Sequence, residues 1–167
     1  MTEPTSKDVR SLDETDLALL ALLQRDGRTP NKTLAELAGI APSTCLTRLR
    51  RLRDIGALRG VHADVDPAAL GRPIQAMIAV RLRPDSRNAM DSFAQTMSTV
   101  PGVLNVYFVS GSYDFMLHVA AAGPDGLRSV IVDELNSRSV VASTETHLIF
   151  EHVRGHLSPA PRSRGAR

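Results

Sequence analysis

The chain has 167 residues, 20 basic and 18 acidic side chains, and 43% hydrophobic residues, a composition that suits one ordinary domain or two small ones and excludes wholesale disorder. The single cysteine excludes an internal disulfide and a thiolate zinc site. The first ten residues lack the apolar core of a secretory signal. No apolar run reaches the roughly 18 residues of a membrane-spanning helix. We therefore expect a cytoplasmic protein without a membrane partner, a metal site or another cofactor.

Residues 11–60 have the apolar spacing of three helices. Ser11 is the expected N-cap of the first helix, because Glu14 follows three residues later. The apolar face of this helix consists of leucines at positions 12, 17, 19, 20, 22 and 23, and Gly27 is expected to stop it. The acidic residues at 13, 14 and 16 suit the positive end of the helix dipole, so we interpret them as capping groups rather than catalytic groups.

The second and third helices are joined by a short turn. Thr29 as N-cap and Pro30 as the first helical residue predict a second helix that runs to about residue 38, where Gly39 ends it. Pro42 opens a third helix that runs to about Ile55. Two helices joined by a three-residue turn that contains glycine form a helix-turn-helix, whose second helix can enter the major groove of DNA.

The outward side of the third helix has the chemistry of a DNA contact. Cys45, Leu49 and Leu52 are expected to face inward, and residues 42–60 carry five arginines against one aspartate. Hydroxyl groups near the helix start can approach phosphates or base edges, and an arginine can pair with guanine. The exposed candidates for DNA binding are Ser43, Thr44, Thr47, Arg48, Arg50 and Arg51. The alternative is a solvated basic face in a protein that never touches DNA.

Residues 74–153 alternate between the period of strands and the period of helices. Strand patterns cover residues 74–82, 103–109, 115–121 and 142–153, and helical patterns cover residues 88–100 and 124–135. The order strand, helix, strand, strand, helix, strand is the ferredoxin-like βαββαβ arrangement.

The predicted fold class is therefore α+β, with two domains. A helix-turn-helix (winged-helix-like) domain covers residues 11–60, and the ferredoxin-like domain covers residues 74–153. Residues 61–73 are expected to contain a short strand at 61–65 and a linker. The basic tail at 154–167 has no apolar period and is expected to be disordered.

Residues 110–114 are expected to form a tight turn between two strands. Gly111 permits a positive φ angle, which lets such a turn expose backbone amides. These amides can hold an α-carboxylate while Asp114 holds an α-ammonium group, so one turn can bind both ends of an amino acid. From the residues alone, a purely structural turn is the alternative.

The N-terminal half carries a spaced pattern that includes Leu12-Asp13, Asp16, Asp26-Gly27-Arg28, Leu34-Ala35, Gly39-Ile40 and Arg48-Leu49-Arg50-Arg51-Leu52. This pattern resembles the Lrp/AsnC ("feast/famine") family of bacterial transcription regulators, and the resemblance continues over roughly residues 11–153. It implies an N-terminal DNA-binding helix-turn-helix and a C-terminal ligand-binding (RAM) domain that dimerises through its sheet and often builds octamers.

The resemblance also implies an effector site between subunits. Residues 110–115 resemble the family's G-x-Y-D turn at the effector pocket, and residues 143–146 resemble its polar strand segment near the same site. The candidate effector-binding residues are Ser110, Gly111, Ser112, Tyr113, Asp114, Thr144 and Thr146. The chain departs from the family at Ala41, where serine commonly caps the recognition helix, and at Ser139-Val140, where a glycine is frequent.

We accordingly predict a non-enzymatic, sequence-specific transcriptional regulator. Its expected partners are double-stranded DNA with a pseudo-palindromic operator, an amino acid or related effector, and further copies of the chain in a homodimer that assembles into a tetramer or octamer. Two alternatives stay open. One is an enzyme resembling the sirohaem decarboxylases, which share the two-domain plan, and the other is an architectural protein that coats DNA with little sequence preference.

Overall fold

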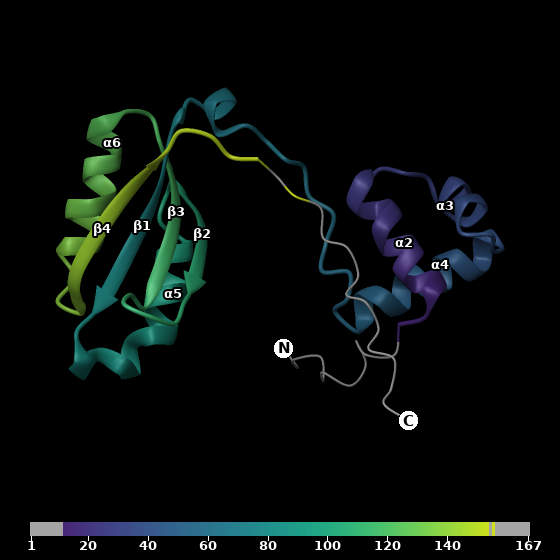
Figure 1. Ribbon diagram of the computed structural model, residues 1–167, viewed down its shortest axis with the longest axis horizontal. Helices are drawn as coiled ribbons and strands as arrows, with labels where there is room; N and C mark the ends of the chain where they lie inside the picture. The colour runs from purple at the N-terminus through teal and green to yellow at the C-terminus, as the bar shows by residue number, and fades with distance from the viewer. Residues whose placement is uncertain (1–11, 154, 156–167) are drawn as a thin grey trace. The chain divides into compact units, whose positions relative to one another are not determined.

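The computed structural model describes residues 12–153 and residue 155 of the chain. These residues divide into two compact units, with the boundary between Ala63 and Asp64 (Figure 1). No helix in this described part is long and apolar enough to span a membrane. The predicted N-cap Ser11 lies outside the described residues. The predicted disordered tail at 154–167 also lies outside them, except for residue 155.

The N-terminal unit contains the three predicted helices, which are α2 (Glu14–Arg25), α3 (Asn31–Leu37) and α4 (Pro42–Asp54). Their apolar sides enclose one core, whose buried members are Leu19, Leu34, Ala35, Cys45, Leu49 and Leu52. Cys45 is fully buried, and this burial raises the pKa of its thiol. The sequence interpretation of Cys45 as a small core residue is confirmed.

Two helix starts differ from the prediction. Helix α2 begins at Glu14 and its N-cap is Asp13, whose carboxylate accepts a hydrogen bond of 2.8 Å from the Asp16 amide. The Asp16 carboxylate accepts in return from the Asp13 amide, and this reciprocal pair replaces the cap expected at Ser11. Helix α3 begins at Asn31, and the hydroxyl of Thr29 donates to the carbonyl of Asp26 instead of capping the helix.

The turn between α3 and α4 follows the prediction. Gly39 has a φ of +66°, and the amide of Ile40 donates 3.0 Å back to the carbonyl of Ala35. This bond satisfies a terminal carbonyl of α3 and redirects the chain, which is the role of a left-handed glycine after a helix. Ala41 is the N-cap of α4 and makes no side-chain hydrogen bond. Helices α3 and α4 therefore form the predicted helix-turn-helix.

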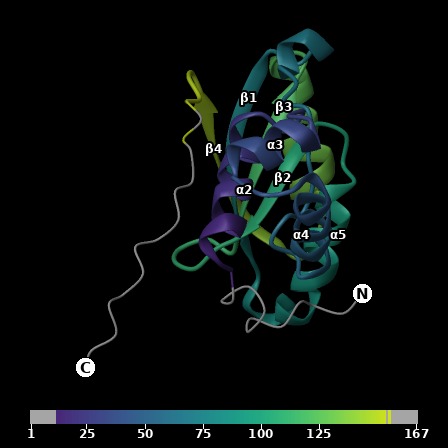
Figure 2. The ribbon, with the colours of Figure 1, turned by 90° about the vertical axis from the view of Figure 1, so that its right-hand side faces the viewer.

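The C-terminal unit is a four-stranded antiparallel sheet with helices on one face (Figures 1 and 2). Its strands are β1 (Ile74–Leu82), β2 (Val103–Phe108), β3 (Phe115–Ala121) and β4 (Val141–Ile149), in the order β2-β3-β1-β4. Helix α5 (Met90–Ser98) lies between β1 and β2 in the chain, and α6 (Pro124–Ser129) follows β3. The predicted ferredoxin-like fold is confirmed.

Alternate residues divide this sheet into a packed face and an open face. Ile78 of β1 lies opposite Leu117 of β3, Val80 lies opposite Phe115, and all four belong to the core shared with the helices. The ring centroid of Phe115 is also 5.0 Å from that of Phe93 on α5. The residues between these along each strand point to the open face, because strand side chains alternate.

Several predicted boundaries in the C-terminal unit are wrong. A 3₁₀ segment, η2 (Pro84–Ala89), precedes α5, so the regular helix is shorter than residues 88–100. A π-helix, η3 (Val130–Asn136), continues α6 where one helix was expected over residues 124–135. Strand β4 ends at Ile149 rather than at residue 153. Apolar spacing over so few residues does not separate these helix types, because the steps of their hydrogen bonds differ by only one residue from one type to the next.

Residues 61–65 do not form the predicted strand. They are irregular, and Val61 packs against Gly27, where an added Cβ would lie 2.5 Å from the Val61 side chain. A strand needs a neighbouring strand for its backbone groups, and the sheet of the described residues does not extend to this segment. In the predicted linker, Asp66 caps a short 3₁₀ turn, η1 (Pro67–Leu70), by accepting from the Ala68 amide.

Candidate DNA-binding surface and candidate effector turn

An open hollow lies on the outward face of α4. It has a volume of about 570 Å³ and is lined by Asp13, Ser43, Thr44, Thr47, Arg48 and Arg51. Five of the six predicted DNA-binding residues therefore share one surface. The sixth, Arg50, is exposed on the same helix but does not line the hollow.

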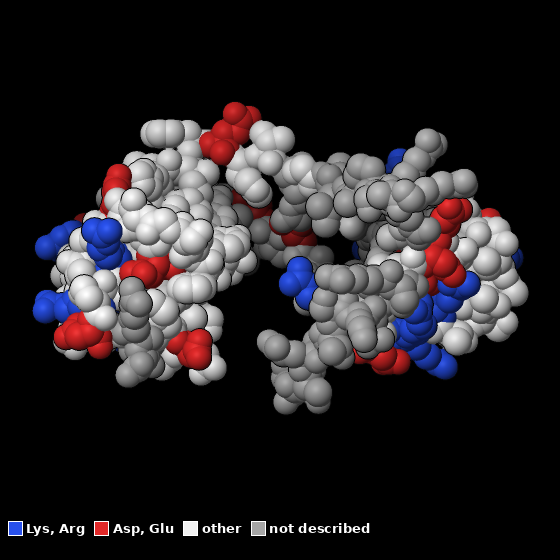
Figure 3. Space-filling view, turned by 60° about the horizontal axis from the view of Figure 1, so that its bottom comes forward, with Lys and Arg blue, Asp and Glu red and all other residues white. Residues whose placement is uncertain are grey.

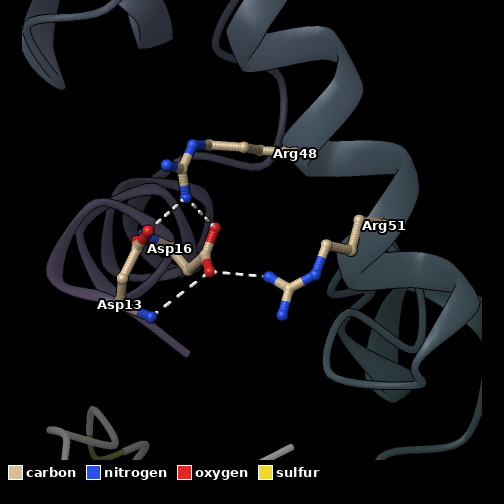
Figure 4. Close-up of polar contacts among 4 residues, drawn as sticks. All are labelled: Asp13, Asp16, Arg48 and Arg51. Atoms are coloured by element: carbon tan, nitrogen blue, oxygen red, sulfur yellow. Dashed lines mark hydrogen bonds and ion pairs between the residues drawn. The ribbon is translucent and has the colours of Figure 1, made fainter. Parts of the chain in front are cut away.

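Two arginines of this surface pair with the same buried carboxylate (Figure 4). The Nη1 of Arg48 lies 2.8 Å from Asp16 Oδ1 and 2.6 Å from Asp13 Oδ2, and the Nη1 of Arg51 lies 2.9 Å from Asp16 Oδ2. The side chain of Asp16 is only 1% exposed. The expectation that Arg48 is exposed is corrected, because its side chain reaches down to Asp16 and is half-buried.

These contacts fix the charges as well as the positions of the side chains. The hydrogen bond from the Asp16 amide, followed by the guanidinium of Arg48, holds the pKa of Asp13 below its ordinary value. Hydrogen bonds to Asp13 and Asp16 in turn raise the pKa of Arg48. In Figure 3, the N-terminal unit at the right shows basic side chains gathered next to acidic ones. The surface thus presents arginines whose charge is partly balanced within the protein.

The turn at residues 110–114 is tied to the neighbouring strand. Gly111 has a φ of +122°, as expected for this turn. The amide of Asp114 donates 3.0 Å to the Val80 carbonyl, and its Oδ2 accepts a 2.8 Å bond from the Leu82 amide. The pairing of β1 with β4 shifts register between Arg81 and Leu82, so Asp114 satisfies an amide at that irregularity. Asp114 therefore has a structural role beside any ligand role.

Tyr113 reaches across the open face of the sheet to β4. Its hydroxyl donates to Glu145 Oε2, and this hydrogen bond is the main cause of a raised pKa for Tyr113. Thr144 and Thr146 lie opposite Val80 and Ile78, so they face the helix side of the sheet. The Thr144 hydroxyl donates 3.3 Å to Asn136 Oδ1. The structure thus separates the two threonines from Tyr113, although the sequence grouped them in one site.

The sequence prediction missed three residues of these sites. It treated Asp13 and Asp16 only as helix-capping groups, although both pair with Arg48, and it did not include Glu145 among the effector residues. Strand alternation was the available signal for Glu145, because Thr144 and Thr146 share one face and the residue between them takes the other. For Asp16 the signal was weaker, since its pairing with α4 joins residues about thirty positions apart in the chain.

Two family models match the chain over these two units. The AsnC-type helix-turn-helix domain matches residues 12–53, and the Lrp/AsnC ligand binding domain matches residues 75–158. The chain belongs to the Lrp/AsnC family. Among its curated relatives, the HTH-type transcriptional regulator AldR of Mycobacterium tuberculosis is 51% identical over 90% of this chain and 86% of its own length. The AldR protein of Mycolicibacterium smegmatis is 50% identical over 92% and 91%.

Solved structures agree with this assignment. The crystal structure of MtbAldR is 46% identical, with a TM-score of 0.74 over 87% of this chain and 99% of that one. A Neisseria meningitidis transcriptional regulator in complex with L-Met is 29% identical, with a TM-score of 0.80 over 90% of this chain and 97% of that one. This Lrp/AsnC protein is therefore a DNA-binding transcriptional regulator with an effector-binding domain. These relatives favour a regulatory function over an enzymatic one.

Proposed function

We propose that α4 is the recognition helix and that it enters the major groove of DNA. The contacts are assigned to Ser43, Thr44, Thr47, Arg48, Arg50 and Arg51. The observation that carries this proposal is the hollow on α4, where hydroxyl groups lie beside two arginines held by a buried carboxylate. Arginine donors match guanine edges and phosphates, and small hydroxyl side chains allow close approach to the DNA backbone.

We infer that the effector is an amino acid bound at residues 110–114. Asp114 uses Oδ2 for the Leu82 amide and can offer Oδ1 to an α-ammonium group. Glu145 adds a second carboxylate, beside Tyr113. The Neisseria relative solved with L-Met supports this class of ligand. We omit Thr144 and Thr146 from this site because they face the helix side of the sheet.

We further propose that the protein acts as a homodimer that assembles into a tetramer or octamer. A two-fold dimer presents two recognition helices about one DNA turn apart, so its operator is pseudo-palindromic. Since its target is DNA, we place the protein in the cytoplasm. Light scattering checks the assembly against the chain mass of 18.1 kDa, and a monomer that binds a palindrome would contradict this part.

The DNA-binding proposal is tested by selection from a pool of random duplexes, followed by gel-shift titration of the enriched sequence. We expect one enriched motif, and Arg51→Ala is expected to weaken binding to it by tenfold or more, on the order of one lost bidentate contact. Arg25→Ala removes the same charge from α2 and serves as the matched control. Enrichment of no motif would favour an architectural DNA-coating protein instead.

The effector proposal is tested by repeating the titration with a pool of the twenty amino acids. Asp114→Asn keeps an oxygen that can accept from the Leu82 amide but loses the negative charge. We therefore expect this variant to bind DNA as the wild type does and to lose its response to the pool. Asp125→Asn on α6 is the control, and a response retained by Asp114→Asn would place the effector elsewhere.

A further inference from the structure

The guanidinium of Arg48 is anchored at only one of its three nitrogens. Nη1 makes both contacts with Asp13 and Asp16. Figure 4 shows the other two nitrogens of Arg48 directed away from both carboxylates. Among the described residues, no partner approaches Nε or Nη2, while the side chain remains 28% exposed and lines the hollow on α4. One edge of the guanidinium is therefore held by the protein and the other is presented outward.

The anchor itself is held by the fold. Asp16 is fully buried and lies in the first turn of α2, where its amide donates to Asp13. Its Oδ1 accepts from Arg48, and its Oδ2 accepts from Arg51 and from the Asp13 amide. A carboxylate with both oxygens engaged and no exposed surface has little freedom to move. It is therefore a fixed point against which an arginine of the recognition helix can be oriented.

We propose that Asp16 is a positioning residue that, together with Asp13, orients Arg48 so that its Nε–Nη2 edge reads a guanine. This inference rests on the proposed function of α4. The two outward donors lie in one plane and match the O6 and N7 acceptors of guanine in the major groove. An arginine that is already held loses less side-chain freedom on binding than a mobile one, which favours the complex.

The charges around the hollow favour a base edge over a phosphate at this position. The Asp13 carboxylate lines the same hollow, and its side chain is 52% exposed. A carboxylate next to the guanidinium repels an anionic phosphate more strongly than it repels the uncharged guanine edge. The arrangement thus gives Arg48 a part in sequence discrimination rather than in general attraction to DNA.

The experiment is the random-duplex selection carried out in parallel on the wild type, Asp16→Asn and Arg48→Lys. We expect the wild type to enrich a guanine at one fixed position of its motif, and both variants to lose that preference while keeping the rest. Their affinity for the wild-type motif should fall by tenfold or more. For unselected duplex, both variants should lose less affinity than they lose for the selected motif, because unselected DNA does not present a guanine at the fixed position.

Two further variants keep the test independent of folding. Asp13→Asn retains an N-cap residue type and removes one of the two anchors, so it should lose part of the guanine preference without a large change in melting temperature. Glu14→Gln removes an exposed charge from the same turn of α2 and should leave the motif unchanged. The double variant Asp16→Asn/Arg48→Lys should lose no more than Asp16→Asn alone, because the anchor of Arg48 is already lost in that single variant.

Specific outcomes overturn the inference. A guanine preference that survives in folded Asp16→Asn or Asp13→Asn but is lost in Arg48→Lys would show that Arg48 reads DNA without the anchor. Equal loss of affinity for selected and unselected duplex would show a merely structural role for Asp16. A preference that survives in every variant would remove Arg48 from base reading. If the wild type enriched no motif, the proposed function would be wrong, and the inference that rests on it would be wrong as well.

Discussion

At the scale of single residues, the N-terminal unit depends on a compact network of opposite charges. Asp16 is buried, and an ionised carboxylate is stable in that position only because it is paired and hydrogen-bonded. The arginines of α4 therefore contribute to folding as well as to DNA binding. Substitutions in this network should alter both properties, and the two effects can be measured separately.

Arg48→Ala is expected to lower the free energy of unfolding by about 1–3 kcal/mol, because it leaves one oxygen of a buried carboxylate without its donor. Arg50→Ala is the matched control, since Arg50 is on the same helix, is exposed and makes no ion pair with another described residue. Urea unfolding measures both variants. Equal stability of the two would contradict the structural role of the Asp16 pair.

Asp13 makes the stability dependent on pH in the acid range. Its pKa in the folded protein is held below the ordinary value of 3.8, so its contribution is complete above that value and is lost as the pH falls through the lower folded value. Asp13→Asn keeps a capping side chain but does not titrate. The unfolding free energy of this variant should therefore fall less steeply than that of the wild type below about pH 4.

The measurement for Asp13 is urea unfolding at a series of pH values, with Glu14→Gln as the control for loss of a charge in the same turn. If the unfolding free energies of the wild type and Asp13→Asn fell identically at acid pH, the contacts of the Asp13 carboxylate with the Asp16 amide and with Arg48 would make no pH-dependent contribution to stability.

At the scale of elements, apolar spacing predicted nearly every helix and strand, whereas the N-caps expected at Ser11 and Thr29 were wrong. The short turn around Gly39 and the strict alternation in β1 were predicted correctly because each depends on local geometry. The missing strand at residues 61–65 and the early end of β4 were not predicted, because a strand also requires a partner that local sequence does not specify.

A substitution at Gly39 directly tests the role of local backbone geometry in the helix-turn-helix. Its φ of +66° is unfavourable for a residue with a side chain, although an added Cβ would meet nothing within 4 Å. Gly39→Ala is therefore expected to destabilise the N-terminal unit by about 1–2 kcal/mol through backbone strain alone. Gly126→Ala in α6, where the added Cβ would make an ordinary 3.6 Å contact with Ala121, should instead be neutral or stabilising.

Thermal unfolding followed by circular dichroism distinguishes these two glycine variants. If Gly39→Ala were as stable as Gly126→Ala, the positive φ at the helix-turn-helix would not limit the choice of residue there.

At the scale of the whole molecule, the residues that the structure describes form two separate hydrophobic cores, one in each unit. The sequence predicted this division from the change of period near residue 74. It could not predict which side chains meet across helices: the pairing of Asp16 with α4 and of Tyr113 with Glu145 depends on packing between segments that are distant in the chain. The residue types of the candidate site were thus predictable, whereas their mutual contacts were not.

Because each unit has its own core, we expect a core mutation to destabilise mainly the unit that contains it. Leu52→Ala removes a fully buried side chain from the N-terminal core, and Phe115→Ala removes one from the C-terminal core. Each should cost about 2–5 kcal/mol and should accelerate amide hydrogen exchange in its own unit. Mass spectrometry of exchanged peptides checks this, and equal acceleration in both units would indicate that the two cores unfold together.

The pairing of Arg48 and Arg51 with Asp16 also bears on how DNA binding responds to ionic strength. Each phosphate that a protein cation neutralises releases condensed counterions, so the logarithm of the binding constant falls by about 0.9 per contact for each tenfold rise in salt. An arginine that keeps a carboxylate as its own counter-charge releases fewer of these ions. Complexes formed through α4 should therefore tolerate salt better than the number of arginines on this helix suggests.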